Sequence, residues 1–74
     1  MSQIPRISGR ETVKALGKIG YDLDRQRGSH MILRQIEYPF RRIVVPDHKE
    51  VAKGTLRGII RQTGLTVEEF KNLL

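Results

Sequence analysis

The sequence has no cysteine and no tryptophan, and aromatic residues make up only 5% of its 74 positions. The absence of cysteine excludes a disulfide framework, an iron–sulfur cluster, a cysteine nucleophile and the usual zinc knuckle, so nothing points to an oxidising compartment. No apolar run approaches the roughly 20 residues of a membrane span, and the N-terminus lacks the apolar segment of a secretory signal. We therefore expect a cytoplasmic protein that makes no use of a membrane.

Acidic residues are outnumbered by basic ones. Eight Asp and Glu stand against 14 Lys and Arg, which gives a formal net charge of +6. The positive electrostatic field of such a small protein attracts phosphates, acidic lipids or an acidic protein partner. The length allows one domain, residues 1–74, and a hydrophobic content of 38% is typical of a small folded domain rather than a disordered tail.

The first predicted helix begins at a capping box, in which the Ser8 hydroxyl accepts from the Glu11 backbone N–H and the Glu11 side chain reaches back. Apolar residues at helical spacing form its buried stripe, and Gly20 in a left-handed conformation is expected to end it. Basic residues recur every four positions and form a ridge on the solvent side, which is either solvated or in contact with phosphate. These ridge residues are Arg10, Lys14 and Lys18.

A period of two then predicts strands over residues 21–27, 30–35 and 41–45, and their short connections indicate an antiparallel meander. A second helix begins near Gly54 and ends at Gly64, and a capping box of Thr66 and Glu69 begins a short last helix. The predicted fold is α+β: an α-β-β-β-α two-layer domain, with a three-stranded antiparallel sheet packed on two helices and a short C-terminal helix. The other face of the sheet is either open or covered by a partner.

Few residues suit the chemistry of a metal or cofactor site. The two histidines, His30 and His48, have no Asp or Glu at a spacing that suggests metal ligands. A phosphate-binding P-loop and a dinucleotide-binding glycine fingerprint are both absent. We therefore expect no metal, no small-molecule cofactor and no Ser-His-Asp triad.

His30 is distinguished by its neighbours, because it follows a predicted tight turn in the segment Arg25-Gln26-Arg27-Gly28-Ser29-His30. An imidazole can take or give a proton near neutral pH, and the arginines can hold a phosphate. These are the requirements for cleaving RNA without a metal: a base removes the 2′-OH proton and an acid protonates the leaving 5′ oxygen. On spacing alone, a surface histidine in a turn remains the commoner alternative.

Five segments, in order and at the expected spacings, resemble the HicA toxin family of small mRNA interferases: Ser8–Glu11, Gly20–Tyr21, Arg25–His30, Arg42–Pro46 and Lys53–Leu65. The resemblance implies a fold similar to the double-stranded-RNA-binding domain, which agrees with the predicted element order. It also implies a toxin of a toxin–antitoxin pair that inhibits translation by metal-independent cleavage of mRNA, with His30 as the catalytic residue and a HicB-type antitoxin as the inhibitor.

Two segments depart from the family pattern. The connection over residues 36–40 is more aromatic than the polar hairpin of the family, and residues 49–51 lack a glycine often found there. Tyr38 and Phe40 in the aromatic connection either pack over the sheet or project as anchors for a partner. Both departures put the shape of the loops and the choice of partner in question, and neither touches the Gly-Ser-His motif.

The predicted site combines proton transfer by His30 with RNA contacts. Gly28 permits the turn and Ser29 orients the phosphate or the imidazole, while His48 either supplies the second proton or belongs to the loop before the second helix. The basic residues expected to contact RNA phosphates are Arg25, Arg27 and Arg34, with Lys14 and Lys18 as outer steering charges. The rival functions are a non-catalytic RNA-binding module of the same fold and a protein-interaction domain whose basic surface meets an acidic partner.

Overall fold

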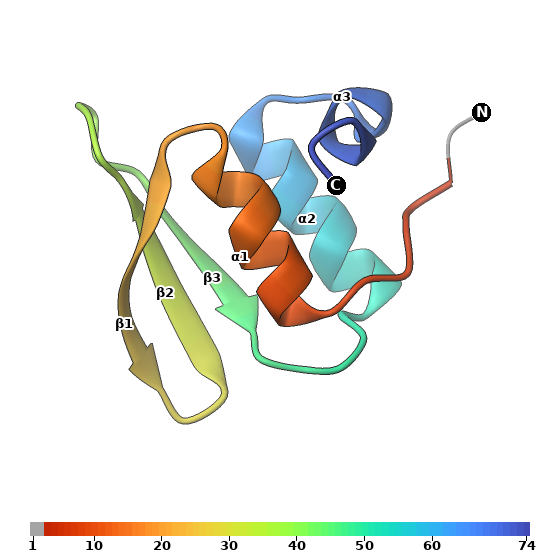
Figure 1. Ribbon diagram of the computed structural model, residues 1–74, viewed down its shortest axis with the longest axis horizontal. Helices are drawn as coiled ribbons and strands as arrows, with labels where there is room; N and C mark the ends of the chain where they lie inside the picture. The colour runs from red at the N-terminus through yellow and green to blue at the C-terminus, as the bar shows by residue number, and fades with distance from the viewer. Residues whose placement is uncertain (1–2) are drawn as a thin grey trace.

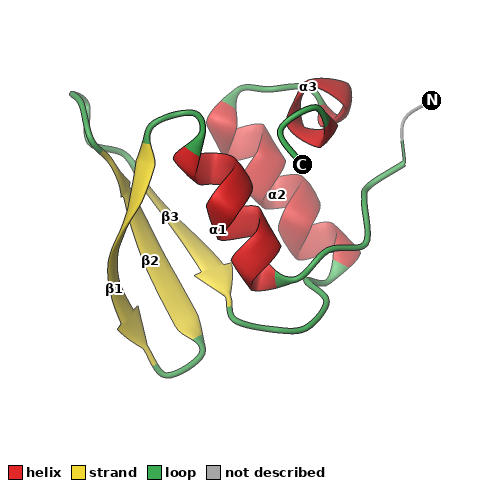
Figure 2. Cartoon of the chain, in the orientation of Figure 1, coloured by secondary structure: helices red, strands yellow, loops and turns green. Residues whose placement is uncertain are grey.

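The computed structural model describes residues 3–74. Its elements are α1 (Gly9–Gly17), β1 (Tyr21–Arg27), β2 (His30–Gln35), β3 (Arg42–Pro46), α2 (Lys53–Thr63) and α3 (Val67–Lys71). The strands form an antiparallel sheet in the order β1-β2-β3, and α1 and α2 cover one of its faces (Figures 1 and 2). The predicted α+β class, including the short C-terminal helix, is confirmed. Among residues 3–74, no helix combines the length and the apolar composition that crossing a bilayer requires.

The capping box of α1 is present as predicted. The Glu11 backbone N–H donates to the Ser8 hydroxyl at 3.0 Å, and the Ser8 N–H donates to the Glu11 carboxylate at 2.9 Å. The helix ends earlier than expected, at Gly17, with Lys18 as its C-cap. Gly20 does adopt a positive φ of 95°, but it lies in the turn that leads into β1 rather than directly after the helix. Its freedom at positive φ lets the chain reverse there.

The core lies between the helices and the covered face of the sheet. Alternate residues of β2 and β3 point into it, and α2 contributes one apolar stripe. Phe70 of α3 is completely buried, and burying an aromatic side chain of this kind stabilises the fold by roughly 1.5–3 kcal/mol. The principal core residues of the sheet and α2 are Met31, Leu33, Ile43, Val45, Leu56, Ile59 and Ile60.

The element boundaries differ slightly from those predicted. β3 is displaced by one residue, since it begins at Arg42 and ends at Pro46, and α2 begins at Lys53 instead of Gly54. Pro46 has no N–H to donate, and it occupies the last position of the third strand, where a proline is tolerated.

A bulge in β1 changes which side chains share a face. Leu23 is paired with Leu33 and Arg25 with Ile32, so Asp24 is an extra residue in β1. An unbroken alternation from the buried Tyr21 would direct Arg25 towards the helices. The extra residue shifts this alternation by one position. Arg25 and Arg27 therefore point away from the helices.

Candidate functional site

His30 is the first residue of β2 and lies directly after the turn of Gly28 and Ser29. It is paired with Arg27 of β1 on one side and with Pro46 of β3 on the other. Directly paired residues of antiparallel strands point to the same face, with Cα atoms roughly 5 Å apart. The exposed imidazole of His30 and the exposed guanidinium of Arg27 therefore share one side of the sheet.

The turn before His30 depends on Gly28. A two-residue hairpin loop favours backbone twists in which the first central residue has positive φ, and Gly28 has φ 58°. A side chain at this position would be strained in that conformation. The Gly28-Ser29 turn thus places His30 directly after the hairpin loop, as predicted.

The face of the sheet that the helices leave uncovered, called the open face below, consists of three cross-strand rows. The first row contains His30, the second has an apolar centre, and the third lies nearest the connection between β2 and β3 (Figure 1). These rows are Arg27–His30–Pro46, Arg25–Ile32–Val44 and Asp22–Arg34–Arg42. Four arginines and one aspartate therefore share this face, which gives it a positive charge.

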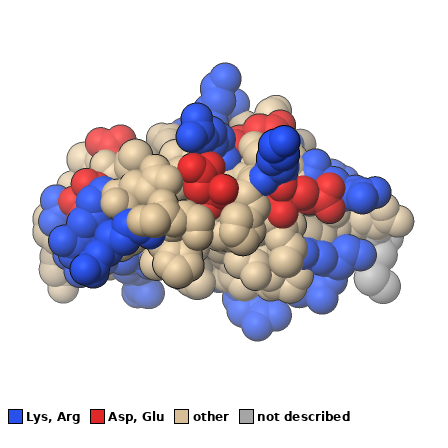
Figure 3. Space-filling model, turned by 90° about the horizontal axis from the view of Figure 1, so that it is seen from below, with Lys and Arg blue, Asp and Glu red and all other residues tan. Residues whose placement is uncertain are grey.

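The predicted phosphate contacts Arg25, Arg27 and Arg34 all lie on the open face with His30. Arg34 is four residues along β2 from His30, a separation of about 13 Å at the rise of a strand. Arg42 joins them through its pairing with Arg34, and sequence reasoning missed it because only the register of β3 places it there. Figure 3 views the molecule from the end where the β1–β2 turn lies, and Lys and Arg side chains gather on its sheet side.

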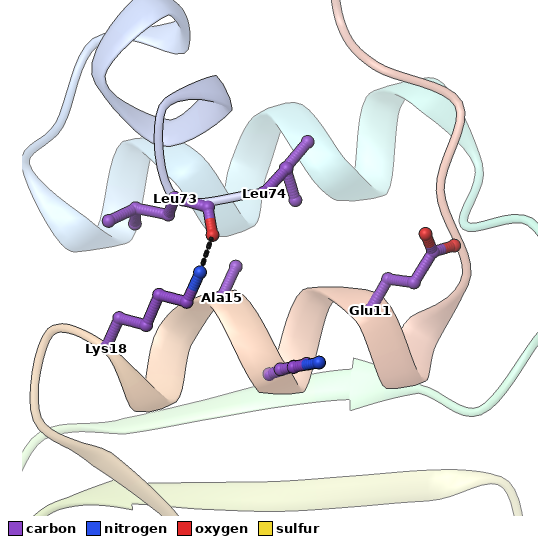
Figure 4. A pocket seen from close by; sticks show the side chains of 6 residues that line it. Glu11, Ala15, Lys18, Leu73 and Leu74 are labelled. Atoms are coloured by element: carbon purple, nitrogen blue, oxygen red, sulfur yellow. Dashed lines mark hydrogen bonds between the residues drawn. The ribbon is translucent and has the colours of Figure 1, made fainter.

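Lys14 and Lys18 lie elsewhere, on α1, in the layer that covers the other face of the sheet. Both line a shallow hollow with Ala15, Leu73 and other residues of α1 and the C-terminal segment, and the Lys18 ammonium donates to the carbonyl oxygen of Leu73 at 2.7 Å (Figure 4). The structure therefore does not bring these two lysines together with His30. A role for them as outer steering charges remains a prediction.

A network that sequence reasoning missed ties the turn before His30 to the end of β3. The backbone N–H of Asp47 donates to the Ser29 carbonyl at 2.6 Å. The side-chain amide of Gln26 donates both to the Gly28 carbonyl at 3.0 Å and to the Asp47 carboxylate at 3.1 Å. Both carbonyls of the turn are thereby held, which fixes the start of β2. No local sequence signal joins Gln26 to Asp47, because the contact depends on the register of all three strands.

The Asp47 carboxylate is also bound by a guanidinium. Hydrogen bonds from Arg10 and then from Gln26, together with the positive charge of Arg10, lower the pKa of Asp47 below its ordinary value. The same contact raises the pKa of Arg10. Asp47 is therefore ionised at neutral pH, and it serves as a fixed acceptor rather than as a proton donor.

The start of α1 packs tightly against the segment that follows β3. The Gly9 N–H donates to the His48 carbonyl at 2.9 Å, and a Cβ atom at Gly9 would overlap the carbonyl oxygen of Pro46. His48 therefore lies at the same end of the molecule as His30, two residues after the β3 partner of His30. The backbone of His48 contributes to the loop before α2, and its side chain is exposed.

The described residues offer no metal centre. Among residues 3–74 there is no group of three or more His, Cys, Asp or Glu side chains that could hold an ion. What the site does offer is an exposed imidazole on the same face of the sheet as four guanidinium groups. This combination suits proton transfer at an anionic substrate such as a phosphodiester.

Comparison with known proteins places these features in a family. No curated protein gave a significant match to the sequence. The family model of the HicA toxin of bacterial toxin–antitoxin systems matches residues 9–65. The match begins at the first residue of α1 and continues just past the end of α2, so it includes the whole sheet, the Gly28-Ser29 turn and His30. Because this match covers well over half of the chain, the protein belongs to the HicA toxin family.

Proposed function

We propose that this toxin is a metal-independent endoribonuclease that inhibits translation by cleaving mRNA. The observation that carries the proposal is the cross-strand pairing of His30 with Arg27, which puts two exposed side chains, an imidazole and a guanidinium, on one side of the sheet. In this proposal His30 is the general base and Arg27 is the cation that binds the phosphate.

In the proposed reaction, neutral His30 accepts the proton of a ribose 2′-OH. The 2′ oxygen attacks the adjacent phosphorus, and the bond from phosphorus to the 5′ oxygen breaks. Arg27 stabilises the charge that develops on the non-bridging oxygens. A second group protonates the leaving 5′ oxygen, and His48 is the candidate because it lies at the same end of the sheet. The products are a 2′,3′-cyclic phosphate and a 5′-hydroxyl.

The remaining site residues act by positioning and attraction. Gly28 gives the turn its backbone shape, and Ser29 orients the phosphate or the imidazole. Arg25 and Arg34 extend the phosphate contacts along the open face, and Lys14 and Lys18 contribute to the long-range field that steers RNA towards the protein.

Membership of a toxin–antitoxin family implies an antitoxin partner. We propose that it is of the HicB type and that the pair acts in the cytoplasm, where mRNA is translated. The positive open face favours a partner that presents acidic groups to it. An antitoxin bound there would exclude RNA from His30 by occupation.

The decisive experiment compares RNA cleavage by the wild-type protein and His30→Ala. Because His30 is exposed, the variant should keep the thermal stability of the wild type while cleavage and growth inhibition are lost. His48→Ala tests the second proton-transfer role: it should form the same cyclic-phosphate product at a slower rate.

Two outcomes contradict the proposal. A folded His30→Ala protein that cleaves RNA at the normal rate would remove His30 from the mechanism. A wild-type protein that binds RNA but never cleaves it would support the non-catalytic RNA-binding module of the same fold, which recognises RNA by shape and 2′-OH contacts.

A further inference from the structure

The connection between β2 and β3 carries a cluster of exposed apolar side chains at the far end of the sheet from His30. Tyr38 is 86% exposed, Ile36 60% and Phe40 48%. The connection extends beyond the ends of the strands, whereas the turn before His30 lies at the opposite end (Figure 1). Tyr38 therefore projects rather than packs over the sheet, and its role as an anchor for a partner stays a prediction.

The backbone of this connection is held in an unusual shape. Phe40 has φ 58°, a left-handed conformation that is strained for a bulky residue. Three hydrogen bonds keep it there: Gln35 N–H to the Arg41 carbonyl at 2.9 Å, Arg41 N–H to the Gln35 side chain at 2.9 Å, and Phe40 N–H to the Glu37 carbonyl at 2.9 Å. Strain that is maintained in this way is typical of binding surfaces.

The aromatic rings are held in place by each other and by an arginine. The rings of Tyr38 and Phe40 meet edge-on, with centroids 6.2 Å apart and an angle of 86° between their planes. The guanidinium carbon of Arg34 lies 5.9 Å from the centre of the Phe40 ring. These contacts orient the Tyr38 ring while leaving most of its surface in solvent.

The surroundings of Tyr38 contain three arginines and are continuous with the open face. Arg34 and Arg42 form the nearest row of that face, and the exposed Arg41 precedes β3. The carboxylates of this region are those of Glu37 and of Asp22 and Asp24, the last two lining a hollow with Arg34 and Ile36. A projecting aromatic ring beside guanidinium groups suits a nucleotide, whose base stacks on the ring while its phosphate meets the arginines.

We propose that Tyr38 is a stacking site for a base of single-stranded RNA that crosses the open face from His30, with Arg34 and Arg42 as its phosphate contacts. The proposal rests on the proposed function in taking RNA as the ligand. β2 spans about 20 Å between the His30 end and the connection, at the rise of a strand. Only RNA of several nucleotides can reach both places, so the site selects long substrates.

The test measures the binding of an RNA that cannot be cleaved. The probe is a fluorescein-labelled oligouridine of about 12 nucleotides, within the range of single-strand binding sites, whose 2′-O-methyl groups block attack on phosphorus. Tyr38→Ala should weaken its binding about tenfold, and Tyr38→Phe, which keeps the aromatic face, should bind within about twofold of the wild type. Ile36→Ala is the matched control, because it removes an exposed apolar side chain of the same connection without removing a ring.

A trinucleotide with the same modification is too short to reach both ends of the open face, so the wild-type protein should bind it more weakly than the long probe. Wild-type affinity of Tyr38→Ala for the long probe would overturn the proposal, as would equal losses in Tyr38→Ala and Ile36→Ala. Unchanged probe binding with faster release of the antitoxin would identify Tyr38 as a protein anchor instead. Because the probe cannot be cleaved, its binding tests the stacking site independently of catalysis. If the protein never cleaves RNA but binds the probe through Tyr38, the proposed function is contradicted and the stacking site is supported.

Discussion

Arg10 at the start of α1 and Asp47 after β3 form a two-point ion pair, with 3.2 Å from Nε to Oδ1 and 3.4 Å from Nη2 to Oδ2. Exposed ion pairs contribute little to stability by themselves. This one matters for the site because the same carboxylate accepts from Gln26, and the backbone of Asp47 binds Ser29. The pair therefore connects the helix layer to the turn that positions His30.

The first prediction concerns the titration of Asp47. Hydrogen bonds from Arg10 and Gln26 lower its pKa, so Arg10→Gln should raise the pKa towards the ordinary value of an aspartate. Because the folded-state pKa is the lower one, the contribution to stability is present above the ordinary pKa and is lost as the pH falls through the lowered pKa. The pKa of Asp47 in both proteins is measured by following the NMR signal of its side-chain carboxyl as a function of pH.

Arg6→Gln provides the control for this titration. Arg6 is also an exposed arginine in an ion pair, but its partner is Glu50, at 3.5 Å. The variant loses the same charge and should leave the pKa of Asp47 close to its wild-type value. Equal pKa values of Asp47 in the wild type and in Arg10→Gln would show that the ion pair is not maintained in solution.

The second prediction concerns Gly9, whose Cα lies against the backbone of Pro46. A methyl group there would overlap the Pro46 carbonyl oxygen, so Gly9→Ala should lower the free energy of unfolding by about 1–3 kcal/mol or more. Gly17→Ala on the same helix is the matched control, because a Cβ there meets nothing within 4 Å. It should be neutral or stabilise by up to about 1 kcal/mol. Denaturant unfolding of both variants checks this, and a Gly9→Ala protein as stable as the wild type would contradict the close approach.

Local signals predicted much of the fold. The pairs Ser8/Glu11 and Thr66/Glu69 are both capping boxes in the structure, and the Gly28-Ser29 turn separates two strands with the predicted bounds. Each of these features depends on residues close together in the sequence, where side-chain chemistry and backbone freedom determine the outcome.

The remaining features depend on residues that are distant in the sequence. Arg10 is exposed, as the ridge on the solvent side predicts, but its pairing with Asp47, 37 positions away, has no local signal. The bulge at Asp24 has no signature in the alternation of β1, yet it decides that Arg25 and Arg27 share a face with His30. The position of His30 could thus be predicted from the sequence, whereas the network that braces its turn could not.

The third prediction concerns chelation. Among the described residues no cluster of ligands could hold a metal, and the proposed reaction moves protons through side chains alone. Treatment with EDTA should therefore leave the rate of RNA cleavage unchanged within about twofold. The measurement is the initial rate on a labelled RNA before and after chelation. Loss of cleavage that one divalent ion restores would replace the proposed mechanism with a metal-dependent one.

The last prediction concerns inhibition by the antitoxin. To inhibit cleavage, the antitoxin must cover at least the row of Arg27 and His30. The positive charge of the open face would attract an acidic partner to this row. Charge contacts act mainly on the rate of association, so Arg27→Ala should slow association roughly two- to tenfold at low ionic strength. The effect should shrink as salt screens the charges.

Arg57→Ala is the matched control for that measurement, since Arg57 is an exposed arginine on α2, in the layer on the other side of the sheet. Both variants lose one positive charge, so the net charge of the protein falls equally. Immobilised antitoxin and two salt concentrations are enough to compare their association rates. If Arg57→Ala slows association as much as Arg27→Ala, then net charge rather than the His30 row guides the encounter.

An antitoxin complex that still cleaves RNA at the rate of the free toxin would rule out inhibition by occupation, because a covered row of His30 and Arg27 leaves no room for the phosphodiester.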